Sequence, residues 1–218
     1  AAGDFTADPT SQLLGGSGAA PTTANVTVTV GSVSSGGDLT SGRISGKDVQ
    51  LTAYGKTGGG TLTIGGVINA GGGVIITGNP GQGPVSLKIN AGITANGALT
   101  ASAQNVVVAP SVALRSEAQG AGAGDLQIAA AGSFTADPTS QLLSGSGAAP
   151  TTAGVSVTAG SATAGGDLTS GLIYGKDVRL TAYGRPGGGA LTVGAAINAG
   201  RSVTITGDPG GLGQGPVT

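Results

Sequence analysis

The sequence FTADPTSQLL occupies Phe5–Leu14 and returns unchanged as Phe134–Leu143. The repetition continues as far as Pro80 and Pro209, with identical residues at 56 of those 76 aligned positions. A match of this length at one offset, 129 residues, is typical of a repeat architecture. The sequence therefore divides into a first copy, residues 1–129, and a second, partial copy, residues 130–218. We expect residues 1–218 to form one continuous solenoid, because each repeat of such an array packs on its neighbours.

A shorter period lies within the long one. Apolar residues alternate with Thr or other polar residues in short runs, which indicates strands. These runs begin at Val26, Val49, Val74, Ala98, Leu126, Val155, Val178 and Val203. A second apolar segment follows most of them, as at Leu39–Ile44 and Leu62–Ile68, after a turn rich in Gly, Asn, Asp or Pro. Because helical periodicity is absent, the pattern predicts an all-β parallel β-helix of about eight coils of roughly 24 residues.

The composition agrees with a narrow solenoid core. Aromatic residues make up 2% of the chain and charged residues 9%, while small and branched apolar residues are frequent. The 46 Gly and 10 Pro approach a disordered composition, but the regular β-branched runs argue against disorder. A net charge of −1 with scattered cations predicts no nucleic-acid partner. No apolar run approaches the length of a membrane span, so no membrane insertion is expected.

The residue types limit the chemistry. The chain has no His and no Cys, which removes Ser-His-Asp catalysis and imidazole or thiolate metal sites. We therefore predict no catalytic residue, no metal, no cofactor and no enzymatic activity. Asp38, Asp48, Asp167 and Asp177 lie in repeated GGDLTSG and GKDV turns, where they are interpreted as capping or solvated groups. The alternative is that stacked coils bring Asp38 and Asp48 together as the carboxylate pair of a sugar-cleaving site.

Two further patterns are interpreted as structural. Thr-x-Thr pairs at Thr27/Thr29, Thr61/Thr63 and Thr204/Thr206 do not recur in every coil, so β-propensity explains them better than an ice-binding face. The sequence Ile-Asn-Ala-Gly at residues 68–71, 89–92 and 197–200 predicts one shared turn. Aligned Asn side chains in that turn would hydrogen-bond along the stack.

The pattern I-N-A-G-x-x-V-x-I/L-x-A/G, at Ile68–Gly78 and Ile197–Gly207, resembles the coil repeat of the filamentous-haemagglutinin family of secreted bacterial exoproteins. This resemblance implies a right-handed β-helix, two-partner secretion through an outer-membrane transporter, and display at or release from the cell surface. It also implies adhesion to a host-cell glycan or surface protein. Coils of roughly 24 residues exceed those typical of the family, so longer turns or a third strand are expected.

Binding is expected where the units lengthen, between Ala98 and Val155, because solenoids carry insertions as loops on one side. The candidate binding residues are Arg115, Glu117, Gln119, Asp137, Gln141, Ser146 and Thr151. A long turn without a partner is the alternative interpretation. The sequence as a whole predicts a non-catalytic shaft or adhesive segment of a surface-displayed exoprotein. The alternative is a polysaccharide-binding or polysaccharide-cleaving β-helix.

Overall fold

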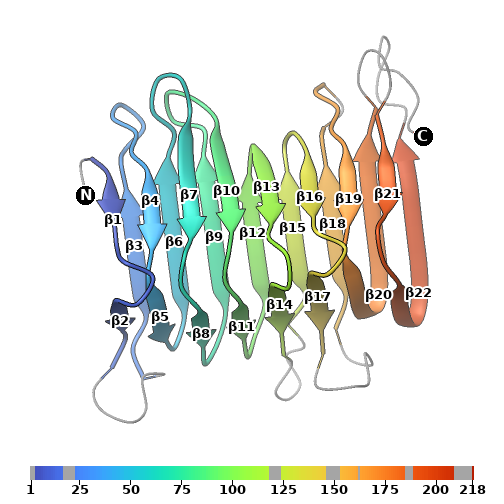
Figure 1. Ribbon diagram of the computed structural model, residues 1–218, viewed down its shortest axis with the longest axis horizontal. Coiled ribbons are helices and arrows are strands. Elements are labelled where there is room, and N and C mark those ends of the chain that lie inside the picture. The colour runs from blue at the N-terminus through green and yellow to red at the C-terminus, as the bar shows by residue number, and fades with distance from the viewer. Residues whose placement is uncertain are drawn as a thin grey trace.

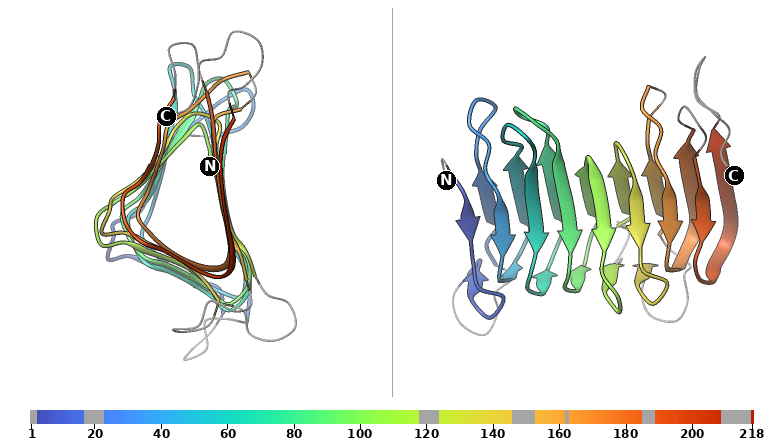
Figure 2. Two further views of the ribbon diagram at one scale, coloured as in Figure 1. Left: turned by 90° about the vertical axis from the view of Figure 1, so that its right-hand side faces the viewer. Right: turned by 45° about the horizontal axis from the view of Figure 1, so that its top comes forward.

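The computed structural model describes residues 3–16, 23–117, 124–145, 153–161, 163–184, 189–208 and 218. Within these ranges the chain forms 22 strands and no helix. All pairings between the strands are parallel. The strands lie on three faces, and the molecule is a rod of triangular cross-section (Figures 1 and 2). The predicted all-β parallel β-helix is therefore confirmed.

Each turn of the chain contributes one strand to each face. The first face consists of β3 (Val26–Val30), β6 (Val49–Tyr54), β9 (Val74–Asn79), β12 (Leu99–Ala103), β15 (Leu126–Ala130) and β18 (Val155–Ala159). The second face consists of β1 (Phe5–Thr6), β4 (Leu39–Ser41), β7 (Gly60–Ile64), β10 (Val85–Ile89), β13 (Asn105–Val108), β16 (Phe134–Ala136), β19 (Leu168–Ser170) and β21 (Leu191–Val193). The third face consists of β2 (Gln12–Leu14), β5 (Arg43–Gly46), β8 (Ile68–Ala70), β11 (Ile93–Ala95), β14 (Ala113–Ser116) and β17 (Gln141–Ser144). Two long strands, β20 (Leu172–Tyr183) and β22 (Ile197–Asp208), begin on the third face and continue on the first.

The chain descends through the second face, nearer the viewer in Figure 1, and rises through the first face behind it while advancing toward the C-terminus. This sense of winding is right-handed. The eight strands of the second face are joined by seven pairings, so the chain makes about seven turns, slightly fewer than the eight predicted. Counting apolar runs overestimated the number because eight strands on one face enclose only seven complete turns.

A third strand accounts for the length of the coils. The predicted segment Leu39–Ile44 is divided at Gly42 into β4 and β5, which lie on different faces. A Cβ atom at Gly42 would lie 2.3 Å from Ser11 Oγ and 2.5 Å from the Asp8 carbonyl oxygen, so only glycine fits this corner. The same division separates β7 from β8 and β10 from β11. The expectation of a third strand is therefore confirmed.

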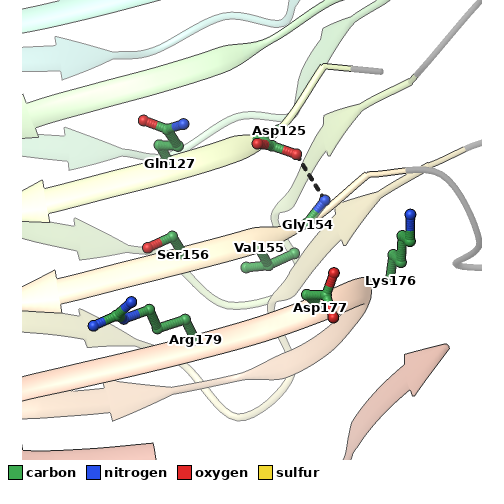
Figure 3. A pocket seen from close by; sticks show the side chains of 8 residues that line it. All are labelled: Asp125, Gln127, Gly154, Val155, Ser156, Lys176, Asp177 and Arg179. Carbon is green, nitrogen blue, oxygen red and sulfur yellow. Dashed lines mark hydrogen bonds between the residues drawn. The ribbon is translucent and has the colours of Figure 1, made fainter. Parts of the chain in front are cut away.

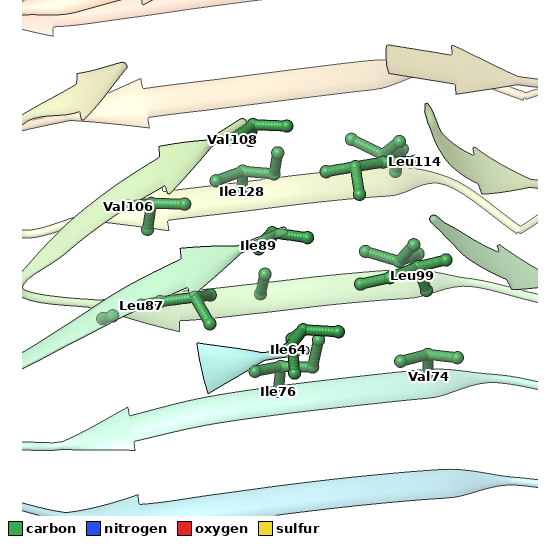
Figure 4. Close-up of a cluster of buried hydrophobic side chains, with 14 of the residues drawn as sticks. Ile64, Val74, Ile76, Leu87, Ile89, Leu99, Val106, Val108, Leu114 and Ile128 are labelled. Atoms are coloured by element: carbon green, nitrogen blue, oxygen red, sulfur yellow. The ribbon is translucent and has the colours of Figure 1, made fainter. Parts of the chain in front are cut away.

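Inward side chains of successive turns stack in register and form one continuous core (Figure 4). Ile64, Ile89 and Val108 lie opposite one another on three neighbouring strands of the second face, and each is at most 1% exposed. Burying each such side chain stabilises the fold by about 1.5–3 kcal/mol. On the first face Leu99, rather than Ala98, pairs with Val74 and begins the inward column. The fourth run therefore starts one residue later than the pattern suggested.

The Ile-Asn-Ala-Gly sequences do not share one turn, contrary to expectation. Ile68–Ala70 is strand β8, whereas Ile89 ends β10 and Asn90 begins the corner after it. The expected Asn ladder is also absent at Asn69, whose register partners are Ser45 and Thr94. Local sequence could not distinguish a strand such as β8 from the corner after β10, because a short Ile-Asn-Ala segment is compatible with both. Its place in the coil depends on the length of the preceding strand.

Candidate functional site

Side chains at the corner between the first and second faces bind the backbone of the next turn. Asp4 Oδ1 accepts a hydrogen bond from the Asp38 amide at 2.8 Å, and Asp38 Oδ1 accepts one from the Thr61 amide at 2.8 Å. In the second copy, Asp167 Oδ1 accepts from the Ala190 amide at 3.0 Å. These carboxylates fix the corner by satisfying amides that leave the strand ladder. The interpretation of Asp38 and Asp167 as turn-capping groups is thus confirmed.

Asp38 also binds Lys56 from the following turn. Lys56 Nζ lies 2.5 Å from Asp38 Oδ2 and 3.8 Å from Asp4 Oδ1. Burial raises the pKa of the Asp38 carboxyl, but the hydrogen bonds from Lys56 and the Thr61 amide outweigh it, so the pKa lies below its ordinary value. The same hydrogen bond from Lys56 raises the pKa of the Lys56 ammonium. Both groups therefore stay charged at neutral pH.

A second column of carboxylates lies at the corner between the third and first faces. Asp48 Oδ1 accepts from the Gly73 amide at 2.9 Å, and Asp125 Oδ1 accepts from the Gly154 amide at 2.8 Å. Asp48 precedes β6 and Asp38 precedes β4, so the two carboxylates lie at opposite ends of the first face (Figure 1). The alternative that stacking brings Asp38 and Asp48 together is therefore wrong. The two residues are close in sequence, but two strands, β4 and β5, and the corner at Gly42 separate them.

Asp177 binds side chains rather than a backbone amide. Its Oδ1 accepts from Arg201 Nε at 2.8 Å and from Ser202 Oγ at 2.5 Å, and its Oδ2 accepts from Arg201 Nη2 at 2.6 Å. The hydrogen bonds from Arg201 and then Ser202 hold the pKa of the Asp177 carboxyl below its ordinary value. The first copy has Gly72 and Gly73 in place of Arg201 and Ser202. The two copies therefore complete the same corner with different donors.

A shallow hollow of about 290 Å³ opens beside Gly154 on the first face (Figure 3). Its walls are Asp125, Gln127, Gly154, Val155, Ser156, Lys176, Asp177 and Arg179. A smaller hollow of about 140 Å³ lies around Asn25, Thr27, Asp48, Val49, Gln50, Gly73 and Ile75. The two hollows share four repeat-related positions: Gly154, Ser156, Asp177 and Arg179 lie one long repeat after Asn25, Thr27, Asp48 and Gln50. We call them the Arg179 hollow and the Gln50 hollow; sequence reasoning missed both.

The structure brings together part of the predicted binding set. Arg115 on β14 and Gln141 on β17 lie on paired strands of the third face, and Arg115 Nη1 is 3.7 Å from Glu117 Oε1. Asp137 lies apart, in the turn before β17, where its Oδ1 accepts from the amide and hydroxyl of Thr139. Those bonds lower the pKa of its carboxyl. Gln119, Ser146 and Thr151 lie outside the described residues, so the grouping stays a prediction.

The outward side of the first face carries a hydroxyl column that the sequence pattern did not reveal. The fourth residue of the six short strands and the tenth residue of β20 and β22 are paired in register along the whole face. The column consists of Thr29, Thr52, Thr77, Ser102, Ala129, Thr158, Thr181 and Thr206. Thr therefore recurs at this single position in most turns, but the neighbouring outward column mixes Thr27, Gln50, Ile75 and Arg179, so Thr-x-Thr pairs do not recur in every coil, as the sequence indicated. That mixture of long and charged side chains is unlike a flat ice-binding face.

Among the residues that the structure describes, no three His, Cys, Asp or Glu side chains gather as a metal site. The same part of the chain contains no helix long and apolar enough to cross a membrane. No protein-family model matches the chain, and neither a curated protein nor a solved structure matches it.

Proposed function

We propose that this chain is a non-catalytic shaft with adhesive surfaces, part of a secreted, surface-displayed bacterial adhesin-like exoprotein. Its partners would be a host-cell glycan or surface protein and, for export, an outer-membrane transporter. The observation that carries the proposal is the repetition of the corner architecture. The Asp38 to Thr61 bond of the first copy returns as the Asp167 to Ala190 bond of the second, 129 residues later. A duplication that preserves the hydrogen bonds of the corners favours a function that depends on the whole rod rather than on one local site.

The use of the carboxylates supports a role without catalysis. Four carboxylates each accept a hydrogen bond from a backbone amide at 2.8–2.9 Å, namely those of Asp38, Asp48, Asp125 and Asp137. Asp177 is occupied by Arg201 and Ser202. The pKa values of the Asp38, Asp137 and Asp177 carboxyls lie below the ordinary value because hydrogen bonds to the charged form outweigh burial, whereas a general acid for glycoside cleavage needs a raised pKa. Polysaccharide cleavage, the first half of the alternative, is therefore the weaker proposal.

Polysaccharide binding remains the second candidate because one observation favours it. The Arg179 hollow places an amide, a hydroxyl and two cations around an open surface on a rigid sheet. Sheets present such groups in fixed positions, which lowers the ordering cost of binding. This second candidate is compatible with an adhesive shaft, since a glycan is one of the expected partners.

The test is the adhesion of beads coated with this chain to epithelial and bacterial cells, with release of reducing ends from polysaccharides measured in parallel. We expect adhesion and no release of reducing ends. A matched variant shortens residues 16–23 and 145–152, the segments that the repeat shares. Loss of adhesion on shortening would assign the contact to these segments. Release of reducing ends would contradict the proposal, and failure of beads to adhere while circular dichroism shows a folded chain would contradict its adhesive part.

A further inference from the structure

The Arg179 hollow has an excess of uncompensated positive charge. Lys176 and Arg179 line the hollow together with Asp125 and Asp177, and Arg201 binds Asp177 from the next turn. Arg201 forms a bidentate pair with Asp177, 2.6 Å between Arg201 Nη2 and Asp177 Oδ2, and so neutralises that carboxylate. Lys176 and Arg179 have no ion-pair partner among the described residues. The hollow is thus equipped to receive a negative group.

The hydrogen-bonding groups of the hollow form a track along the rod. Gln127, Ser156 and Arg179 lie opposite one another on β15, β18 and β20, all on the outward side of the first face. Neighbouring strands are about 4.8 Å apart, so the track presents a polar group at each step of that length. Asp125 adds an acceptor at the upper end of the hollow, since only its Oδ1 accepts from the Gly154 amide. The track offers donors and acceptors together (Figure 3).

The open shape depends on Gly154. A Cβ atom at this position would lie 3.2 Å from the Asp177 carbonyl oxygen and 3.6 Å from Asp125 Oδ1, pointing into the corner between the two acidic residues. The first copy has Asn25 at the equivalent position, and Gln50 replaces Arg179. The smaller Gln50 hollow shares four repeat-related positions with the Arg179 hollow, carries a longer corner side chain and lacks the guanidinium, so it serves as a partial natural control.

We propose that the Arg179 hollow binds an acidic polysaccharide chain lying along the axis of the rod. A sugar carboxylate would pair with the planar guanidinium of Arg179 at one end of the hollow, and Lys176 at the other end would meet a second carboxylate of the same chain (Figure 3). Sugar hydroxyls would donate to Asp125 and exchange hydrogen bonds with Gln127 and Ser156. The inference deepens the proposed adhesive role by naming a ligand class and a place, and it rests on that role for its biological meaning.

The chemistry favours this ligand over others. A nucleic acid would need more phosphate-binding cations and stacking aromatics, and the hollow has two free cations and no aromatic side chain. A densely sulfated polymer would bring many charges close to the Asp125 carboxylate. A neutral polysaccharide would leave the Arg179 and Lys176 charges without partners. A chain that alternates one carboxylate with several hydroxyls matches both the net charge and the acceptors.

The experiment measures binding of polygalacturonate oligomers to this chain by calorimetry, beside the same oligomers with their carboxylates reduced to alcohols and beside dextran sulfate. Arg179→Gln gives the hollow the residue of the first copy, and Gln50→Arg makes the reciprocal change. Lys88→Gln is the matched control, because Lys88 is an exposed cation on β10 of the second face. Unfolding midpoints of all variants report whether the fold is intact.

We expect the uronate oligomers to bind and the reduced oligomers not to bind. Arg179→Gln should weaken binding about tenfold or more, since a hydrogen bond to a charged group is lost. Gln50→Arg should add binding, and Lys88→Gln should leave it unchanged. Any of three results would overturn the proposal. The first is an equal loss of affinity in Arg179→Gln and Lys88→Gln, and the second is equal binding of the reduced and unreduced oligomers. The third is tighter binding of dextran sulfate than of the uronate oligomers. If the proposal is overturned but beads coated with the unsubstituted chain still adhere to cells, the adhesive role stands without this ligand. If those beads do not adhere, the adhesive role itself fails.

Discussion

Asp8 and Asp137, one long repeat apart, form the same turn with the same partners. Asp8 Oδ1 accepts from the Thr10 amide at 2.8 Å, and Asp137 Oδ1 accepts from the Thr139 amide at 2.8 Å. In both turns the Ser hydroxyl three residues on donates to the Asp carbonyl oxygen. A Pro follows each Asp and fixes the backbone angle that the turn requires. The repeated decapeptide thus preserves a complete corner between the second and third faces, rather than a surface motif.

Acid should destabilise the rod. The pKa values of the Asp8, Asp38, Asp137 and Asp177 carboxyls lie below the ordinary value, so the folded chain binds fewer protons than the unfolded chain in this range. The stabilisation is present above the unfolded value of about 3.9 and is lost as the pH falls through the folded values. Thermal midpoints measured by circular dichroism should therefore fall from about pH 5 downward. Asp137→Asn should show a smaller fall; a midpoint that is constant or rises toward pH 3 would show that these bonds do not govern stability.

Truncating one inward side chain should be costly, and truncating its outward neighbour should not. Leu87 on β10 is fully buried, whereas Val107 on β13 is 43% exposed. We expect Leu87→Ala to lower the free energy of unfolding by about 2–5 kcal/mol, through lost transfer energy and a residual cavity. Val107→Ala should change it by less than about 0.5 kcal/mol, as is usual at exposed positions. Urea unfolding measures both, and equal losses would argue against the inward and outward assignment of these strands.

The sequence predicted the fold class well because its strand period is regular and its core positions are mostly apolar. It also predicted the capping role of Asp38, since Asp beside Gly favours turns. It did not predict the two hollows, because Gln127, Ser156 and Arg179 are far apart in the chain and only the register of β15, β18 and β20 aligns them. Aligning the inward residues of successive apolar runs sets the register of the strands. That alignment would have revealed the outward column of Gln127, Ser156 and Arg179 and the Thr column beside it.

Close approach of two corners should make Gly166 intolerant of a side chain. A Cβ atom at Gly166 would lie 1.9 Å from the Gly132 carbonyl oxygen, a backbone atom that cannot move aside easily. Gly166→Ala should therefore lower the free energy of unfolding by about 1–3 kcal/mol through overpacking. At Gly92 the nearest atom, the Ala113 carbonyl oxygen, would be 3.5 Å away, an ordinary contact. Gly92→Ala should be neutral or stabilising by up to about 1 kcal/mol. Denaturant unfolding of both variants measures this difference in the free energy of unfolding. Equal values for the two variants would mean that the corners at Gly132 and Gly166 can move apart.

Two buried hydroxyls, Ser41 and Ser170, occupy equivalent positions in the two copies and have no hydrogen-bond partner among the described residues. They are 2% and 0% exposed. An unsatisfied buried polar group costs free energy, so replacing it with a group of similar shape that needs no partner removes that cost. We expect Ser41→Ala and Ser170→Ala each to be neutral or to raise the free energy of unfolding by about 1 kcal/mol.

The matched control is Ser144→Ala. Ser144 is also buried, but its Oγ accepts a hydrogen bond from Ser116 Oγ at 3.0 Å. Removing it leaves Ser116 without this partner, so the free energy of unfolding should fall by about 1 kcal/mol. Chemical denaturation with a common m-value compares the three variants. A loss at Ser41 or Ser170 equal to that at Ser144 would mean that these hydroxyls bind a partner in solution, with buried water as the first candidate, because a water in such a site needs polar neighbours.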